Sequence, residues 1–199
     1  MDPITIDDLD PLVAFHGHMC PGLAVGVRAA RIGLREVGRP PQQPVSVVAE
    51  TAMCSVDAVQ FLTGCTLGNG DLVFRDHGKN AFTFVRRSDG RAVRVMTRPD
   101  ALPPDPDHAR LRRLVDEGVA TDAQRARFSE LHLARAEMIL ALADDDLFSV
   151  EVEDHPPSLP DDRTQETVVC ARCGEAVMQT RVVVTADGFR CAPCREAAG

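Results

Sequence analysis

The chain has 199 residues, with 30 acidic side chains against 22 Lys and Arg and a formal net charge of −8. This acidic excess argues against a nucleic-acid-binding surface, because such surfaces depend on clustered Lys and Arg. No Trp or Tyr and only eight Phe are available to stack on bases or sugars. No stretch approaches about 18 uninterrupted apolar residues and no apolar run follows an N-terminal basic region, so we expect a soluble, cytoplasmic protein without a membrane partner.

The cysteines and the length suggest a metalloprotein with one main domain. Seven cysteines is an odd number, and four of them form two Cys-x-x-Cys pairs, which in the absence of an export signal favours metal ligation over disulfides. A length of 199 residues suits a main domain of roughly 150 residues followed by a small unit. We expect a main domain over residues 1–155, an acidic, proline-containing linker over 156–167 and the small unit over 168–199.

Hydrophobic periodicity and turn residues predict alternating helices and strands in the first half of the chain. A short helix is followed by a buried helix, whose Arg28, Arg31 and Arg35 are expected outside its buried face. Ser55 as N-cap and Gly64 as C-terminal stop bound a third helix. The predicted elements are helix Ile4–Phe15, helix Pro21–Val37, strand Val45–Glu50, the helix from Val56 to Leu62, and strands Asp71–Asp76, Ala81–Arg86 and Arg91–Met96.

Four prolines after Met96 separate these strands from two further predicted helices, Asp107–Val119 and Thr121–Ala143, and a short strand over Leu147–Val152. The second helix carries an apolar stripe, for which packing in the core or in a homodimer is the favoured explanation. His132 beside the stripe is most simply a surface histidine. The stripe comprises Leu131, Leu133, Ala134, Met138, Ile139 and Leu142.

The segment 15–22, Phe-His-Gly-His-Met-Cys-Pro-Gly, is the strongest indication of chemistry in the main domain. If it is extended, then His16, His18 and Cys20 lie on one face and offer three ligands to one cation. Pro21 places Cys20 near the N-cap of the following helix, where the helix dipole favours a thiolate. The alternative is a histidine pair that caps a loop beside a buried cysteine.

Four blocks in order resemble the FmdE family, which takes its name from formylmethanofuran dehydrogenase. They are the segment 15–22, then Cys54-x-x-Asp57-Ala-x-Gln60, then Thr63-Gly-Cys-Thr-x-Gly68, then Asp76-x-Gly78-Lys79-x-Ala-Phe-x-Phe84. The resemblance covers residues 10–98 and extends more loosely to about 155. It implies an α+β domain with a mixed sheet backed by helices, in the order α-β-α-β-β-β, and a tendency to dimerise. Nothing resembles a pterin-binding domain or an iron–sulfur motif, so the redox step of formylmethanofuran dehydrogenases cannot be placed on this chain.

The resemblance also implies site residues. His16, His18 and Cys20 become ligand candidates from the first block and Cys54 from the second, although a buried cysteine is the alternative for Cys54. The role of Cys65 stays open. Asp57 is either a carboxylate that orients a ligand or one that complements the helix dipole. Lys79, with His77 nearby, either steadies an anionic substrate or belongs to a solvated turn, and Cys20, Asp57 and Lys79 are the catalytic candidates.

The C-terminal pairs Cys170-Ala-Arg-Cys173 and Cys191-Ala-Pro-Cys194 have the spacing of a zinc ribbon. Two such knuckles joined by a hairpin, here Gln179–Thr185 and Phe189 around an Asp187-Gly188 turn, supply four thiolates to one Zn²⁺. A unit this small depends on its metal for folding. A redox dithiol or an iron site is the alternative.

The sequence therefore predicts a zinc ion in a C-terminal ribbon and a second divalent metal, zinc or another transition metal, in the main domain. The leading function is an enzyme or accessory subunit in one-carbon or molybdenum- and tungsten-enzyme metabolism, since a mixed His/Cys site leaves room for water or substrate. The alternative is a metal carrier or assembly factor whose ribbon docks on a client enzyme. The sequence does not decide between catalyst and accessory protein, and it fixes neither the substrate nor the client.

Overall fold

The structure is a computed structural model that describes residues 9–197 except 41, 43, 155–156 and 160–165. The chain divides into two compact units, Met1–Leu159 and Pro160–Gly199. Most of the expected linker, and the first part of the helix expected over Ile4–Phe15, lie outside the described residues. None of the described helices is long and apolar enough to cross a membrane.

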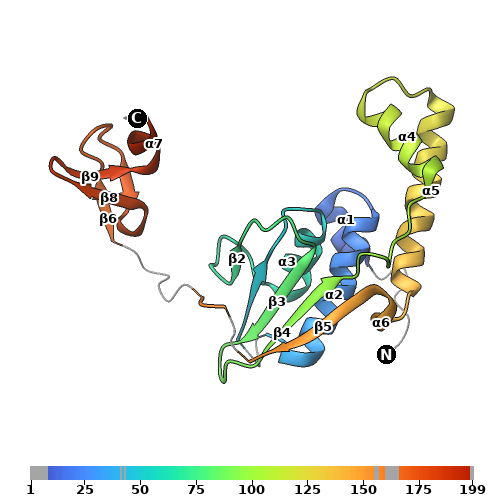
Figure 1. The fold of residues 1–199 in the computed structure, drawn as a ribbon, viewed down its shortest axis with the longest axis horizontal. Coiled ribbons are helices and arrows are strands. Elements are labelled where there is room, and N and C mark those ends of the chain that lie inside the picture. Colours follow the sequence, from blue (N-terminus) through green and yellow to red (C-terminus); the bar gives the residue numbers. More distant parts are fainter. Residues whose placement is uncertain (1–8, 41, 43, 155–156, 160–165, 198–199) are drawn as a thin grey trace. The chain divides into compact units, whose positions relative to one another are not determined.

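The first unit contains six helices and five strands among its described residues (Figure 1). The helices are α1 Asp10–His16, α2 Pro21–Val37, α3 Ser55–Thr63, α4 Pro106–Asp116, α5 Asp122–Ala141 and α6 Asp144–Leu147. The strands are β1 Val45–Ala49, β2 Leu72–Phe74, β3 Ala81–Arg86, β4 Ala92–Thr97 and β5 Phe148–Glu153. Most of these elements lie close to the predicted ranges, but α6 was not predicted and β2 is shorter than the strand expected over Asp71–Asp76.

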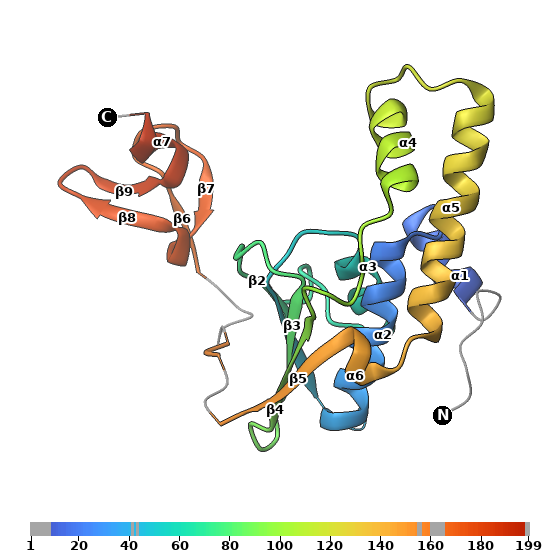
Figure 2. The ribbon, with the colours of Figure 1, turned by 45° about the vertical axis from the view of Figure 1, so that its right-hand side comes forward.

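The five strands form one mixed sheet in the order β2-β1-β3-β4-β5. Strands β1 and β2 are parallel and are connected through α3, whereas β1–β3, β3–β4 and β4–β5 are antiparallel. Figures 1 and 2 show the helices gathered on one face of this sheet, with α2 nearest to it. The prediction of an α+β fold with a mixed sheet backed by helices is confirmed.

Helix α2 can approach its neighbours closely because it carries glycine where they meet. A Cβ on Gly33 would lie 2.3 Å from Cγ of the buried Phe84, so the missing side chain gives the ring its place against the helix. A Cβ on Gly26 would lie 2.2 Å from the backbone oxygen of Ser55, in the first turn of α3. The absence of a side chain at these positions therefore sets the distance from α2 to the sheet and to α3.

The buried face of α5 differs from the expected apolar stripe. Ala136, Ile139 and Leu140 are buried, whereas Leu133 and Met138 are exposed. The placement of Arg28 away from the buried face of α2 was also wrong. The Arg28 guanidinium is buried and donates to the backbone oxygens of Ile139 and Leu140 at 2.9 and 2.8 Å, and to Asp144 at 2.7 Å. Arg28 thus fixes α5 against α2 by satisfying carbonyl groups at the C-terminal end of α5.

Glu50, directly after β1, accepts a two-pronged ion pair from Arg94 of β4, with distances of 2.7 Å from Nε and 3.1 Å from Nη2. The hydrogen bond from Arg94 is the main cause that lowers the pKa of Glu50, and one from His77 assists it. The ion pair therefore stabilises the fold at pH values above the pKa of Glu50 in the unfolded chain. This stabilisation is lost as the pH falls through the pKa of Glu50 in the folded protein.

We expect Glu50→Gln to lower the free energy of unfolding by about 2 kcal/mol at pH 7, because it leaves the largely buried Arg94 without a charged partner. The difference from wild type should shrink as the pH falls through the lowered pKa of Glu50 in the folded protein, because the wild-type carboxylate then takes up a proton. Urea unfolding over a series of acidic pH values measures this effect. Glu151→Gln on β5, where the carboxylate is exposed, is the matched control and should change stability by less than about 0.5 kcal/mol. A difference that does not shrink anywhere along the acidic series would contradict the assignment.

Candidate metal centre

The first part of the site lies where helix α1 ends and helix α2 begins. His16 is the last residue of α1, and Gly17 follows with φ of 101°, a left-handed conformation that favours glycine. Beyond this glycine, His16 Nε2 lies 3.8 Å from Cys20 Sγ. Because His16 is helical, residues 16–20 do not meet the condition of an extended segment under which His16, His18 and Cys20 would share one face. His16 and Cys20 meet because a left-handed glycine turns the chain, and not because alternate strand residues share a face.

Cys20 occupies the N-cap of α2, as Pro21 predicted. Its backbone is extended, and its sulfur accepts a hydrogen bond from the Leu23 N–H at 3.3 Å. The expected thiolate was wrong for the protein without metal, because burial, with a smaller contribution from the neighbouring Cys54, raises the pKa of the Cys20 thiol to about 11. The cost of burying a charged thiolate thus outweighs the stabilisation that the Leu23 N–H group gives to it. Only a cation close to the sulfur can compensate for that cost.

Helix α3 brings the second block of the sequence to the same place. Cys54, and not the expected Ser55, is the residue before the helix, while Ser55 is buried and its hydroxyl donates to Asn80 Oδ1 at 2.9 Å. Asp57 Oδ2 lies 2.6 Å from His16 Nδ1. A carboxylate that holds one ring nitrogen of a histidine leaves the other nitrogen available to a metal. The carboxylate that was expected to orient a ligand therefore contacts one of the predicted ligands.

Two groups of potential ligands meet at Cys20. One ligand atom each of His16, Cys20 and Cys54 lie within 4.8 Å of one another, and so do those of His18, Cys20 and His132. The interpretation of His132 as a simple surface histidine was wrong. Its ring is half-buried, and its Nδ1 lies 2.8 Å from His108 Nε2. Burial, followed by the charge of His108, lowers the pKa of His132 to about 4, so its imidazole is neutral at pH 7.

Two members of the first group, His16 and Cys54, line a cleft of about 480 Å³. His16, Cys54, Asp57 and Gln60 contribute its polar wall. The rest of the wall is largely apolar and includes Met53, Val56, Leu67, Leu72 and Phe74. An ion held by this group would therefore face a cleft of the size that accepts a small molecule.

Two other sequence candidates lie apart from this cleft. Cys65 is buried and its thiol donates to the backbone oxygen of Val45 at 3.3 Å, which gives it a structural role. Lys79 is exposed and is not among the described residues that line the cleft. Its neighbour His77 pairs with Glu50 at 3.1 Å. The geometry therefore gives no support to Lys79 as a group that contacts a substrate there.

Comparison with known proteins now decides the family. The family model described as "FmdE, Molybdenum formylmethanofuran dehydrogenase operon" matches residues 15–149, more than half of the chain. The chain belongs to the FmdE family. The match includes both halves of the His/Cys centre, from α1 and α2 to His132 of α5.

Two proteins resemble this FmdE-family chain, one in fold and one in sequence. A tungsten formylmethanofuran dehydrogenase FmdE-like protein from Syntrophus aciditrophicus has a similar fold, with a TM-score of 0.65 and 24% identity over 100% of this chain and 98% of that one. A probable S-adenosyl-L-methionine-binding protein from Archaeoglobus fulgidus is 33% identical over 89% of this chain. The chain spans about half the length of this second protein, 50%.

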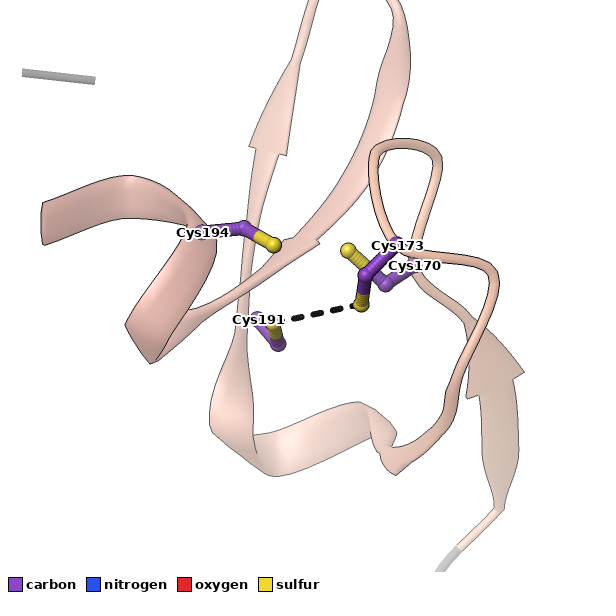
Figure 3. Close-up of side chains that lie close together, drawn as sticks. All are labelled: Cys170, Cys173, Cys191 and Cys194. Carbon is purple, nitrogen blue, oxygen red and sulfur yellow. Dashed lines mark hydrogen bonds between the residues drawn. The ribbon is translucent and has the colours of Figure 1, made fainter. Parts of the chain in front are cut away.

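The second unit lies beyond the family match and contains strands β6 Thr167–Val169, β7 Ala176–Met178, β8 Val182–Thr185 and β9 Gly188–Cys191, the 3₁₀ turn η2 Gln179–Arg181 and helix α7 Ala192–Glu196. Ligand atoms of Cys170, Cys173, Cys191 and Cys194 lie within 4.8 Å of one another (Figure 3). The first pair lies in the turn between β6 and β7. The second pair is not a knuckle between strands, since Cys191 ends β9 and Cys194 lies in α7.

The hairpin of this unit is shorter than expected. Residues Gln179–Arg181 form the 3₁₀ turn, and β8 begins only at Val182. The turn shifts by one residue, because Thr185 pairs with Gly188 and leaves Ala186 and Asp187 between the strands. Backbone groups of Cys173, Cys191 and Arg172 lower the pKa of Cys170 to about 6. Four sulfurs at this spacing suit a tetrahedral ion and fit the ribbon interpretation.

Proposed function

We propose that this FmdE-family chain holds one divalent transition-metal ion, most simply zinc, on His16, Cys20 and Cys54, and that the remaining coordination position receives a small substrate in the adjoining cleft. The observation that carries this proposal is that the three donors lie within 4.8 Å of one another and that two of them, His16 and Cys54, line the cleft. Two cysteines and one histidine form a donor set found in catalytic zinc sites that keep a fourth position open. When bound, such an ion supplies Lewis acidity toward an oxygen or sulfur atom of the substrate.

The residues around the donors support this assignment. Asp57 fixes the His16 ring through Nδ1 at 2.6 Å and leaves Nε2, which lies 3.8 Å from Cys20 Sγ, for the ion. No Lys or Arg is among the described residues that line the cleft, and most of its wall is apolar. We therefore propose a neutral, largely apolar substrate, for which the cleft excludes water and orients one polar atom toward the ion.

The metabolic setting that we propose is one-carbon or molybdenum- and tungsten-enzyme metabolism, because the family description names a formylmethanofuran dehydrogenase operon. The chain would serve there as an enzyme or as an accessory subunit. A homodimer remains a prediction, for which the exposed Leu133 and Met138 of α5 offer apolar surface. S-adenosyl-L-methionine is named only for the longer Archaeoglobus protein. Its addition to the apoprotein in equilibrium dialysis is a direct test of whether this chain shares that ligand.

The test of the metal assignment uses the full chain, reloaded with Co²⁺, and compares Cys54→Ser with Cys65→Ser as the matched control. Loaded with excess Co²⁺ that is then removed, Cys54→Ser should retain one ion fewer per chain, whereas Cys65→Ser should retain as many as wild type, because the Cys65 thiol lies outside the cleft and contacts Val45 O. Asp57→Asn should weaken binding by about 10- to 100-fold, the usual effect of removing a group that orients a ligand.

An open coordination position gives a second measurement. Added imidazole should shift the visible Co²⁺ spectrum of the wild-type protein and of Cys65→Ser, but not that of a site already filled by four protein ligands. Equal metal content in Cys54→Ser and wild type would refute the ligand assignment, and a spectrum insensitive to imidazole would refute the open position.

The separate unit with its four cysteines favours a second candidate, a metal carrier or assembly factor that docks on a client enzyme through this unit. Transfer kinetics separate the two candidates. A carrier should pass the ion of the first unit to a chelating acceptor within seconds to minutes, whereas a catalyst should retain it over many hours.

A further inference from the structure

The thiol of Cys20 belongs to two groups of ligands at once. His16 and Cys54 belong with it to the first group, and His18 and His132 belong with it to the second. These residues form two groups rather than one group of five. Ligands of a single tetrahedral ion lie only about 3.3–3.8 Å apart, as bonds of about 2.0–2.3 Å require. One ion therefore cannot take all five side chains, whereas two ions that share Cys20 can.

The two groups are also oriented in the same way. His16 Nδ1 is held by Asp57 at 2.6 Å, and His132 Nδ1 is held by His108 Nε2 at 2.8 Å. In both cases Nε2 is the nitrogen left for an ion. The ring of His132 is further fixed by Phe128, since their centroids lie 4.9 Å apart, and by its stacking on His108, where the planes differ by only 3°.

The packing of α5 on α2 explains how a residue so distant in the sequence reaches Cys20. Arg28 lies eight residues after Cys20 on α2, about two helical turns, and bonds to Ile139 and Leu140 of α5. His132 lies seven residues before Ile139, also about two turns, and approaches Cys20. The two helices therefore run in the same direction with matched spacing, and the buried Arg28 sets the register that places His132 beside Cys20.

We propose that the Cys20 thiolate bridges two divalent transition-metal ions. The first is the ion of the proposed function on His16, Cys20 and Cys54, on which this inference rests, and the second is bound by His18, Cys20 and His132. Binding releases the Cys20 proton to solvent and leaves a thiolate between two cations, which offsets the cost of burying its charge. His18 is exposed, so the second ion has a route of entry from solvent and a coordination position open to water.

The test is the number of Co²⁺ ions bound per chain by the full-length protein, counted after anaerobic loading of the apoprotein. Wild type should bind three ions: two at the bridged centre and one at the cluster of four C-terminal cysteines. His132→Ala and, from the other side of the site, His18→Ala should each bind two. His77→Ala removes a histidine that pairs with Glu50 and not with Cys20, and as the matched control it should bind three. Cys20→Ser should bind one, since both ions share this thiolate.

Magnetic coupling between the two ions distinguishes a ligand role of His132 from a merely structural one, because only the loss of a ligand would abolish the coupling. Two Co²⁺ ions joined by one thiolate should give an electron paramagnetic resonance signal well below that of three independent ions. The signal per ion should recover in His132→Ala. Three ions with a depressed signal support the bridge.

The two proposals fail differently. If wild type and His132→Ala both bind two ions, the proposed second ion of the bridged centre is refuted and the proposed function stands. If wild type binds a single ion, both the bridged centre and the proposed function are refuted. Three ions in wild type with unchanged content in His132→Ala and His18→Ala would refute the ligand assignment. Far-ultraviolet circular dichroism verifies that each variant is folded, and if His132→Ala is not, His18→Ala carries the test.

Discussion

Replacing Cys194 by serine is expected to unfold the second unit and to leave the first unit folded. Within the described residues of the second unit, only Cys170 and Cys191 are buried apolar side chains, so the unit has almost no hydrophobic core. We therefore expect its folding free energy to come largely from an ion on the four thiolates, which contributes on the order of 10 kcal/mol or more in comparable small zinc domains. Loss of one thiolate removes most of that contribution.

The first unit does not share this dependence. It buries its own core between α2, α5 and the five-stranded sheet, including Phe82, Phe84 and Phe148. Backbone amide spectra of Cys194→Ser should therefore lose the dispersed signals of residues 166–197 and retain those of residues 9–154. A strong chelator added to wild type should produce the same selective loss. Dispersed signals from the second unit in the metal-free variant, or loss of signals from both units together, would contradict this prediction.

Gly26→Ala is expected to be among the most destabilising single substitutions in the first unit. The new Cβ would lie 2.2 Å from Ser55 O and 2.8 Å from Ala58 Cβ, and the closest contact is with backbone, which cannot rotate away. Alanine gains about 1 kcal/mol of helix propensity over glycine, but overpacking of this severity costs about 3 kcal/mol or more. We therefore expect a net loss of at least about 2 kcal/mol in the free energy of unfolding.

The same substitution should weaken metal binding, because the strain falls on the first turn of α3. Cys54 and Asp57 are both carried by that turn, and Gly22 lies in the same seam, where its Cβ would be 3.1 Å from Cys54 Cβ. Urea unfolding and Co²⁺ titration of Gly26→Ala measure the two effects. Gly68→Ala, whose Cβ would meet only Thr66 Oγ1 at 3.9 Å, is the control and should resemble wild type. A stable Gly26→Ala that binds Co²⁺ normally would show that the close approach of the helices is not required.

The sequence by itself determined the elements and much of the chemistry. Apolar periodicity located α2, β1 and β3 almost to the residue, because these elements bury most of their length and their pattern is local. The spacing of the four C-terminal cysteines was sufficient to bring them together, since a short hairpin leaves few other arrangements. The blocks that begin at Phe15 and Cys54 identified the family, which the match over residues 15–149 confirmed.

Only the tertiary structure decided the surroundings of Cys20. The helix-capping position of Cys20 suggested a low pKa, but the side chains that bury it come from other elements, and burial raises the pKa to about 11. The contact between His16 and Asp57 spans 41 residues, and that between Arg28 and Ile139 spans 111. His132 had no sequence signal at all, because a single histidine on an amphipathic helix has the same local pattern whether it faces solvent or a thiol. Its position depends on the register of two packed helices, which the buried Arg28 sets.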